Sequence, residues 1–378
     1  MKKRDSLTTE LSSMRASGAI WSNFPNSEIE ALKIGKTYSA LRELKNDPHL
    51  YSCVQSRKSG SIMLEWKTLP NNAEKSSIEL IEKSLASIDI LAFIRDILEA
   101  PLFGFQPLEI IWEQDNESYF AKSIRPKLQE DFLFTNSGEL RFRTLDAAAG
   151  GEIPELKILC PRYEATQYNQ YGASLLAKCF WLVKFKNGTS KLWAECCEKY
   201  GLPSLVGKVN RNATMNEANE IADSLAAMGA NTAIVVPHDI ELEFKEHNRL
   251  GSNELFQSFI QHCNSEISKA ILSQTLTTEL GSSGSYAAAA THFKVRREII
   301  LSDAKLIERT FNELFKYILK ANGIEGSAPM FSLILNDSDN SQRIERDKII
   351  MQYGSVKFSK DYWIRNYGFK EEDFLNQD

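Results

Sequence analysis

Long apolar runs are absent from this sequence, and their absence excludes several classes of protein. Among the 378 residues, no apolar run approaches the length of about 18 residues that a membrane span requires. The first residues, MKKRDSLTTELSS, lack the apolar core of a signal peptide. We therefore expect a protein that has no membrane partner and that stays in the cytoplasm.

Histidine and the motifs of metal or nucleotide chemistry are also scarce. The five histidines are isolated from one another, the H-x-E spacing of metal-dependent enzymes does not occur, and no Walker motif is present. The pair His238-Asp239 has no nucleophile motif near it and is typical of a turn. We therefore expect no catalytic residue, no metal and no cofactor, in a protein that is not an enzyme.

Three glutamates leave an enzymatic alternative open. Glu99, Glu109 and Glu113 are candidates for the paired carboxylates of a hydrolase. The last two alternate with apolar residues in LEIIWE, residues 108–113, as in a half-buried strand with one solvated face. This alternation favours the strand.

Cysteine is limited to six residues, none of which forms a C-x-x-C pair. A chain of this length does not need disulfides for stability, so free and mostly buried thiols are expected. Adjacent Cys196 and Cys197 would point in different directions on a helix, which favours core packing over redox chemistry.

The charge balance shows no basic excess. The sequence holds 45 Lys and Arg against 50 Asp and Glu, and so lacks the bias of proteins that clamp duplex DNA through its phosphates. DNA is still a possible partner, because a conduit through which DNA slides should avoid tight phosphate binding. With 25% charged and 43% hydrophobic residues, the composition is that of a globular protein.

The most informative stretch is YGASLLAKCFWLVKFKNGTSKLWAECCEKYGLPSLVGK, residues 171–208. Residues 174–185 are mostly apolar, and Trp181 and Phe185 lie four apart, which predicts a helix with a wide apolar face. On this segment alone, a kinked amphipathic helix pair of some other helical protein is an alternative.

Two interruptions are expected in this stretch. The Asn-Gly pair at 187–188 should kink or end the first helix, and the Thr-Ser pair at 189–190 can cap a second helical run. That run should stop at Gly201, with Pro203 two residues later. The pattern predicts helix, kink, helix and tight turn.

Periodicity elsewhere predicts a mainly helical α+β protein. Thr214 and Glu217 form a capping box, Trp66 is expected in the core, and the last long helix is expected to pack over the helix before it. Helices are expected from about residue 51 to Gly60, over 76–98, 215–228, 252–272 and 287–319, and in two short pieces around Gly354. Strands are expected up to residue 66 and over 108–112, 118–126, 131–143, 155–161, 232–237, 241–246 and 330–335.

Residues 274–290, QTLTTELGSSGSYAAAA, differ sharply from their surroundings. They are rich in Gly, Ser and Ala and carry one charge, Glu279. The Gly-Ser-Ser-Gly spacing fits neither a P-loop nor a G-x-S-x-G elbow. By itself the segment indicates a flexible linker between two helices, with no contact to DNA.

The central stretch also resembles a known family. The order YG-x-S-L-L, C-F-W, F-K, W-A-E, E-K-Y-G-x-P-x-x-V-G-K is similar to the hallmark segment of the Mu-like bacteriophage portal proteins. The likeness covers about residues 52–369 and includes an L-x-W strand and the elements GF and LEI-x-W. It implies the phage portal fold of wing, stem, clip, tunnel loop and small crown, assembled as a ring.

The resemblance also divides the chain into parts. It implies an N-terminal arm and wing (1–117), a β-rich clip (118–165), a stem helix with a kinked continuation (166–200), a second piece of wing (201–273), a tunnel loop (274–290), and a long helix with a C-terminal wing or small crown (291–378). No extended helical crown is expected.

Site residues follow from the same resemblance. The DNA-contacting tunnel loop is expected to use Thr277, Thr278, Gly281, Ser282, Ser283, Gly284 and Ser285. Stem packing and ring assembly are expected to use Trp181, Lys184, Phe185, Trp193, Tyr200, Gly201 and Pro203.

The implied function is that of a head-tail connector of a Mu-like phage or prophage, a ring channel for DNA packaging and ejection. The implied partners are further copies of the chain in a dodecamer, double-stranded DNA without sequence specificity, the terminase large subunit, and capsid and head-tail adaptor proteins. The implied location is the capsid vertex of the virion, with the host cytoplasm during assembly. Alternatives are a DNA-processing enzyme of the nuclease type and a helical adaptor protein.

Overall fold

The computed structural model describes residues 37–115, 118–135, 137–143, 150–201, 204–209, 212–227, 232–237, 249–275, 286–334, 340–354, 356–367 and 369. The chain divides into two compact units. The larger spans Met1–Met63 and Thr68–Phe331, and the smaller spans Leu64–Lys67 and Ser332–Asp378.

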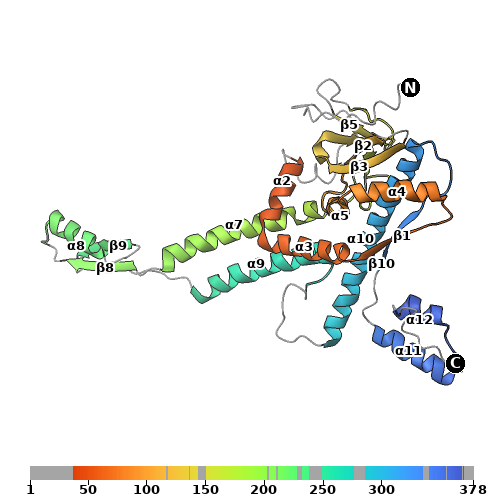
Figure 1. Ribbon diagram of the computed structural model, residues 1–378. Coiled ribbons are helices and arrows are strands. Elements are labelled where there is room, and N and C mark those ends of the chain that lie inside the picture. Colours follow the sequence, from red (N-terminus) through yellow and green to blue (C-terminus); the bar gives the residue numbers. More distant parts are fainter. Residues whose placement is uncertain are drawn as a thin grey trace. The chain divides into compact units, whose positions relative to one another are not determined.

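Short helices form the first part of the larger unit (Figure 1). They are α2 (Thr37–Glu43), a 3-10 turn (Leu44–Asn46), α3 (Pro48–Ile62), α4 (Lys75–Ser87), α5 (Ile90–Ile97) and α6 (Ala100–Phe103). The single helix expected over 76–98 is two helices, because Asp89 has extended backbone and its side chain caps α5 by accepting from the Ala92 amide. The expected helix and strand over 51–66 are confirmed as α3 and β1 (Glu65–Leu69).

A three-stranded antiparallel sheet follows, in the order β3-β2-β7. Its strands are β2 (Leu108–Asp115), β3 (Ser118–Pro126) and β7 (Ile158–Leu159). The Glu109 side chain is fully buried, with its carboxylate 2.7 Å from Lys127 Nζ and 3.3 Å from Lys157 Nζ. The expectation that Glu109 lies on a solvated face was wrong, because two lysines compensate the burial of its charge.

A second small sheet joins β4 (Phe132–Phe134), β5 (Leu140–Phe142) and β6 (Gly151–Glu152), after a 3-10 turn at Gln129–Asp131. Phenylalanines of β4 and β5 belong to the main hydrophobic core of the larger unit. The β2–β3 hairpin also crosses the expected boundary between residues 117 and 118. The described strands of residues 118–165 therefore pack with the main body.

Two long helices, α7 (Leu175–Gly201) and α9 (Arg249–Leu272), pack side by side (Figure 1). α7 is one uninterrupted helix, so a helix end at residues 187–188 was wrong, whereas the expected end at Gly201 is confirmed. A Cβ added at Gly188 would meet no atom within 4 Å, so no close approach requires a glycine here, and its presence in the helix costs about 1 kcal/mol relative to alanine.

Between α7 and α9 the chain forms β8 (Ser204–Val209), α8 (Met215–Ala227) and β9 (Thr232–Pro237). β8 pairs with β9 in parallel, and we did not expect β8 as a strand. The capping box is confirmed: the Thr214 amide donates to Glu217 Oε2 at 2.9 Å and the Glu217 amide to Thr214 Oγ1 at 3.4 Å. The strand expected over 241–246 lies outside the described residues.

The longest helix is α10 (Tyr286–Ala321), which ends at Asn322-Gly323 as expected. Its main partners are α3, α4, α5 and β3. The expectation that its apolar stripe packs over α9 was wrong, because α9 packs mainly against α7 and α3 instead.

The smaller unit contains most of β1 and β10 (Met330–Ile334), which pair with each other, and helices α11 (Asn340–Tyr353) and α12 (Lys360–Tyr367). The hydroxyls of Tyr362 and Tyr367 both donate to the buried Asp347 carboxylate at 2.7 Å and fasten α12 to α11. Trp66 is 41% exposed, so its expected place in the core was wrong.

Candidate assembly surface and the root of α7

The start of α7 is set by a close contact between two glycines. Gly104 has φ of 95° and Gly172 has φ of 78°, values that favour glycine. A Cβ on Gly172 would lie 2.4 Å from the carbonyl oxygens of both Gly104 and Tyr163, and a Cβ on Gly104 would lie 2.5 Å from the Tyr171 carbonyl oxygen. The GF and YG motifs therefore meet in space, and neither glycine can carry a side chain.

The residues next to these glycines fix the same point. Tyr171 packs edge-on against Phe105 and Phe134, with ring centroids 5.6 and 5.0 Å apart, and its hydroxyl accepts from the Phe134 amide at 3.3 Å. Ser174 is buried, donates to the Leu102 carbonyl at 2.8 Å and accepts from the Ala177 amide at 3.1 Å. The YG-x-S motif thus anchors and caps the helix.

α7 and α9 are held together by polar and aromatic contacts. The buried Lys186 ammonium lies 2.5 Å from the Asp47 carboxylate, which precedes α3, and donates to Asn264 of α9 at 2.9 Å. Further along, Trp193 of α7 stacks on Phe256 of α9, with ring centroids 6.5 Å apart. These pairs fix the two helices as an antiparallel hairpin.

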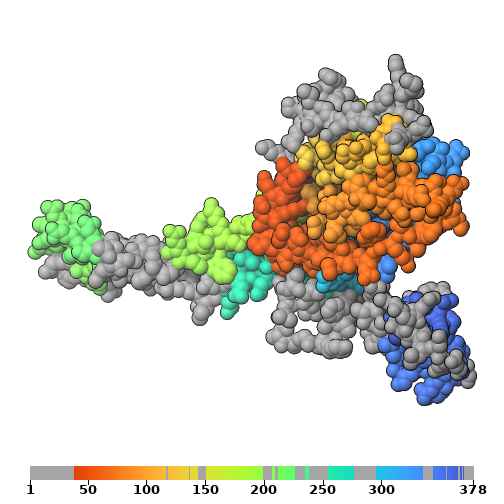
Figure 2. Space-filling model, viewed as in Figure 1, coloured from red at the N-terminus to blue at the C-terminus, as the bar shows by residue number. Residues whose placement is uncertain are grey.

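One face of α7 is apolar and exposed. Trp181, Phe185 and Leu192 are 49%, 52% and 57% exposed, and their spacings of four and seven place them on one stripe about 16 Å long. The Trp181 and Phe185 rings stack on each other at 5.6 Å. In Figure 2 this part of α7, drawn in light green beside teal α9, is not covered by another described element on the face shown. Exposed apolar stripes of this kind mark interaction surfaces.

The expected assembly residues therefore separate into groups. Trp181 and Phe185 lie on this stripe, and Lys184 is exposed beside it with its ammonium 5.6 Å from the Phe180 ring. Trp193 is half-buried against α9. Tyr200 and Gly201 end α7, with side chains outside the described set, and Pro203 also lies outside the described residues.

The expected DNA-contacting residues all lie outside the described part of the chain. These are Thr277, Thr278, Gly281, Ser282, Ser283, Gly284 and Ser285. The structure places the ends of their segment, at Thr275 after α9 and at Tyr286, where α10 begins.

Within the described residues, no group of three or more His, Cys, Asp or Glu side chains is placed to hold a metal ion. No helix in that part of the chain is long and apolar enough to cross a membrane. The six cysteines are free; Cys53, Cys179 and Cys263 are buried, whereas Cys197 is exposed and does not take part in the core packing that we expected.

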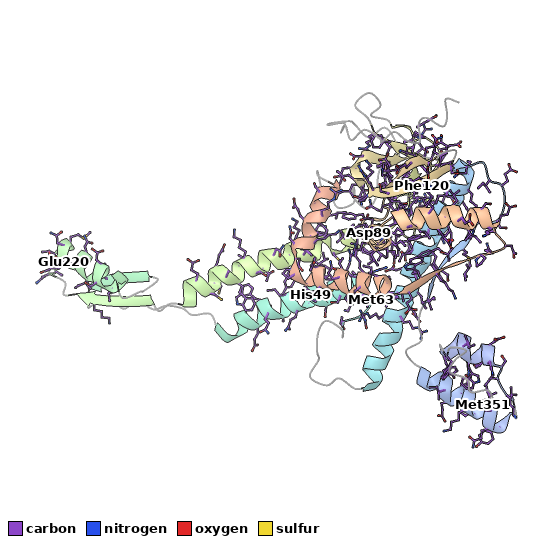
Figure 3. The ribbon with its side chains drawn as sticks, in the orientation of Figure 1. His49, Met63, Asp89, Phe120, Glu220 and Met351 are labelled. Atoms are coloured by element: carbon purple, nitrogen blue, oxygen red, sulfur yellow. The ribbon has the colours of Figure 1, made fainter. Side chains whose placement is uncertain are left out.

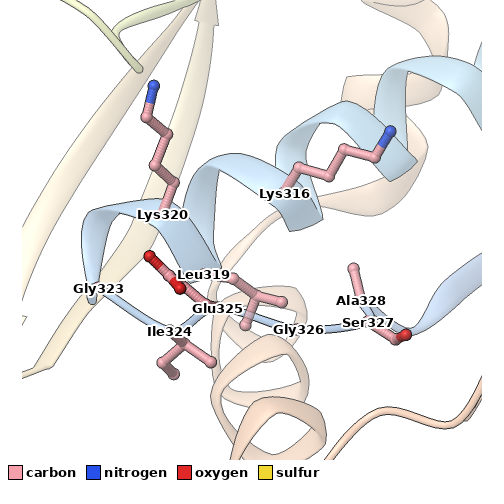
Figure 4. Close-up of a pocket in the computed structure, with 9 residues that line it drawn as sticks. All are labelled: Lys316, Leu319, Lys320, Gly323, Ile324, Glu325, Gly326, Ser327 and Ala328. Carbon is pink, nitrogen blue, oxygen red and sulfur yellow. The ribbon is translucent and has the colours of Figure 1, made fainter.

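A pocket of about 490 Å³ lies at the C-terminal end of α10 (Figure 4). Its lining combines Lys316, Lys320 and Glu325 with small residues of the loop that follows. Lys320 also reaches Glu155 at 3.4 Å. The charged side chains that line this pocket are exposed, unlike the convergent, buried polar groups of a ligand site.

A charged cluster joins α3, α5 and the 3-10 turn after α2. The Glu99 carboxylate lies 2.5 Å from both Lys45 Nζ and Lys58 Nζ. Burial opposes its ionisation, but the two lysines outweigh that effect and lower the pKa of Glu99. Burial, and then the negative charge of Glu99, raise the pKa of Asp96 to about 6.

This raised pKa makes Asp96 a source of pH-dependent instability. A carboxyl whose pKa is higher in the folded state stabilises the fold below its unfolded pKa and loses that contribution as the pH rises through about 6. Because the group is only half-buried, we expect Asp96→Asn to raise the free energy of unfolding by about 1 kcal/mol near pH 7.5. Near about pH 3, below the unfolded pKa of an aspartate, the variant and the wild type should unfold alike. Thermal unfolding at both pH values measures this, and an equal difference at both contradicts it.

The elements described above are shared with known proteins. The model of a family described as the portal protein of Mu bacteriophage matches residues 38–369, which include the glycine contact, the α7–α9 hairpin and α10. The chain belongs to this family of portal proteins. The resemblance noted in the sequence is thereby confirmed.

Two relatives of this portal-family chain are known phage or prophage proteins. One is the portal protein of Escherichia phage Mu, 28% identical over 288 residues, which are 73% of this chain and 55% of the relative. The other is the Mu-like prophage FluMu protein gp29 of Haemophilus influenzae, 27% identical over 314 residues, which are 80% of this chain and 58% of the relative. The chain thus spans little more than half the length of the relatives it matches.

A solved structure shares the fold. A chain from the virion of a native gene transfer agent particle superposes with a TM-score of 0.59, at 11% identity, over 98% of this chain and 99% of that chain. This confirms the mainly helical α+β portal fold. Sequence reasoning missed the reciprocal contact of Gly104 and Gly172, although both glycines stood in the motifs that carried the resemblance.

Proposed function

We propose that this portal-family chain is the structural subunit of a ring at the capsid vertex of a Mu-like phage or prophage, where it forms the channel for DNA packaging and ejection. The observation that carries the proposal is the exposed apolar stripe of α7 in a chain whose family is that of phage portals. The role is structural and not catalytic. Double-stranded DNA passes without sequence specificity, and the partners are the terminase large subunit, capsid proteins and head-tail adaptors.

The stripe on α7 has a second copy of the chain as its proposed occupant. A ring repeats one heterologous contact around its axis, so a surface on each subunit meets a different surface on the next. The apolar side chains of Leu255 and Phe259 on α9 are also exposed, by 66% and 39%, and offer a complementary surface on the same hairpin. Contact between the α7 stripe of one subunit and α9 of the next would bury both.

We assign the role of the clip to residues 202–248. The reason is topological: β8, α8 and β9 lie between two long antiparallel helices, so they are carried at the end of the hairpin away from the core. A two-stranded sheet with one helix has little core of its own and is suited to docking on partners. We assign the contacts with terminase and adaptor to this segment, in place of 118–165.

The ring is tested by mass and by image. Twelve subunits of 42.8 kDa should elute in size-exclusion chromatography with light scattering at about half a megadalton, whereas an enzyme or adaptor should run as a small species. Negative-stain images should show rings with a central channel. A monomer at all protein concentrations, with no ring in the images, rejects the proposal.

The tunnel-loop role of residues 274–290 remains part of the proposal. Shortening the segment within 276–285 should leave ring assembly intact, because we expect few buried contacts to be lost. Packaged DNA per particle should fall, because the neutral hydroxyls that we expect to contact the phosphates are removed. Ser282→Arg with Ser283→Arg should also impair translocation, in this case through phosphate attachment that eases as salt rises. Normal packaging by the shortened loop, or loss of rings, favours the linker interpretation.

A further inference from the structure

One buried arginine joins three parts of the larger unit. Arg57 lies on α3, and its Nε and Nη2 donate to the two carboxylate oxygens of Asp303 on α10, both at 2.8 Å. The two side chains are 6% and 1% exposed. This is the planar two-bond arrangement that arginine makes with a carboxylate and that lysine cannot reproduce.

The same guanidinium also holds the end of α9. Its Nη1 donates to the Ile271 carbonyl at 3.1 Å, in the last turn of α9, where helical carbonyls have no intrahelical donor. The guanidinium carbon lies 5.4 Å from the Tyr163 ring centroid, and Tyr163 belongs to the backbone contact at the root of α7. Arg57 therefore ties α3 to α9, to α10 and to the loop before α7.

The N-terminal end of α3 is fastened to the hairpin independently. Asp47 caps α3 through the Leu50 amide and pairs with Lys186 of α7. His49, labelled in Figure 3, has its Nε2 2.8 Å from Ser268 Oγ of α9. α3 thus bridges the α7–α9 hairpin at one end and α10 near the other.

The crossing of α3 and α10 leaves little room for sliding. A Cβ on Gly60 would lie 2.6 Å from Ile300 Cδ1, so the two helices approach closely one turn away from the ion pair. Arg296 of α10 also donates to the Ser56 carbonyl at 3.3 Å. A shift of α9 relative to α3 would therefore break the hydrogen bond to Ile271 before it disturbed the α3–α10 contact.

We propose that Arg57 is a positioning residue that fixes the end of α9 relative to α10, so that a displacement of the α7–α9 hairpin reaches α10 through α3. Buried ion pairs often add little net stability over apolar residues of similar volume, so the specific contribution of this pair is geometric. The biological use of the coupling rests on the proposed portal function, since docking at residues 202–248 would supply the displacement. The geometric part does not depend on it.

The test separates geometry from stability. Arg57→Met alone leaves Asp303 buried without a partner and should lower the Tm strongly, whereas Arg57→Met with Asp303→Leu should regain a Tm within about 5 °C of the wild type. Spin labels at Gln261→Cys on α9 and Ser302→Cys on α10, both exposed positions, report the distance between the helices. Labelled chains are diluted with unlabelled chains so that distances within one chain dominate.

Native thiols interfere little with this labelling. Cys196 and Cys197 are replaced by serine in the labelled background, since Cys197 is exposed. Burial raises the pKa of Cys160 to about 12, so its thiol stays protonated and reacts slowly. Wild-type chains should give one narrow distance distribution, and the double variant should lose that peak although it is folded. A wild-type distribution in the double variant overturns the proposal, as does a double variant whose Tm stays as low as that of Arg57→Met.

A phage assay then distinguishes the proposed coupling through Arg57 from the proposed portal function. If the portal function holds, particles with the double variant should form rings but retain less DNA than the wild type. Arg57→Lys should retain more DNA than the double variant but less than the wild type, because one ammonium cannot donate to Asp303 and Ile271 together. Wild-type retention by the double variant overturns the coupling. Failure of the wild type itself to form rings rejects the portal function and leaves the distance measurement valid.

Discussion

Gly172→Ala should destabilise the larger unit by about 4 kcal/mol or more, a large part of the stability of an ordinary domain. The new Cβ would meet two carbonyl oxygens at 2.4 Å, in a backbone conformation with φ of 78°. Neither oxygen belongs to a flexible side chain, so the backbone at the root of α7 must move. Thermal unfolding, followed by circular dichroism, should show a large fall in Tm or little folded protein.

Gly188→Ala is the matched control for that experiment. It makes the same chemical change 16 positions later, in the middle of α7, where an added Cβ meets no atom within 4 Å. Alanine is the better helix former, so this variant should gain about 0.5–1 kcal/mol when both are measured at one protomer concentration. Equal losses for the two variants would show that the glycine contact does not fix the root of the helix.

Trp181→Ser combined with Phe185→Ser should abolish rings while the subunit stays folded. Both side chains are half exposed within one chain, so their removal together should cost the subunit about 1.5–3 kcal/mol, which an ordinary domain can lose and stay folded. If the stripe packs on the next subunit, the pair provides aromatic anchors worth about 2 kcal/mol or more each at every contact. Light scattering should therefore show the ring replaced by monomers or small oligomers, and circular dichroism should show that they are folded.

Two further variants make this result specific. Tyr168→Ser removes an aromatic ring that is 84% exposed and lies outside α7, and should leave ring yield unchanged. Trp193→Ala removes the half-buried ring that stacks on Phe256, and should lower subunit stability by about 1–2 kcal/mol. Rings at wild-type yield in the Trp181 and Phe185 variant would place the subunit contact elsewhere.

The sequence by itself determined the family, the fold class and most element positions. α9 and α10 follow from apolar periodicity, and the start of α8 follows from Thr214 and Glu217, because these signals act between residues three or four apart in one helix. The aromatic spacing of Trp181 and Phe185 likewise indicated one shared face of a helix. Such local signals are readable because both partners lie within a turn of each other.

Only the tertiary structure decided where α7 ends and which charged side chains are buried. The Asn-Gly pair at 187–188 resembles a helix end, yet α7 continues, because packing along α9 outweighs the intrinsic cost of about 1 kcal/mol. Glu109 was expected in solvent, yet its buried carboxylate forms salt bridges with Lys127 and Lys157, which are distant in sequence.

Our proposed place for the clip depends on tertiary contacts in the same way. Residues 118–165 and 202–248 both contain short strands, and periodicity gives no reason to prefer one as the clip. Phenylalanines of β4 and β5 place the first segment in the main core, whereas β8, α8 and β9 of the second lie between the antiparallel helices α7 and α9. The packing of β4 and β5 in the main core and the packing of α7 on α9 join residues far apart in the chain, so their free energies exist only once the fold has formed.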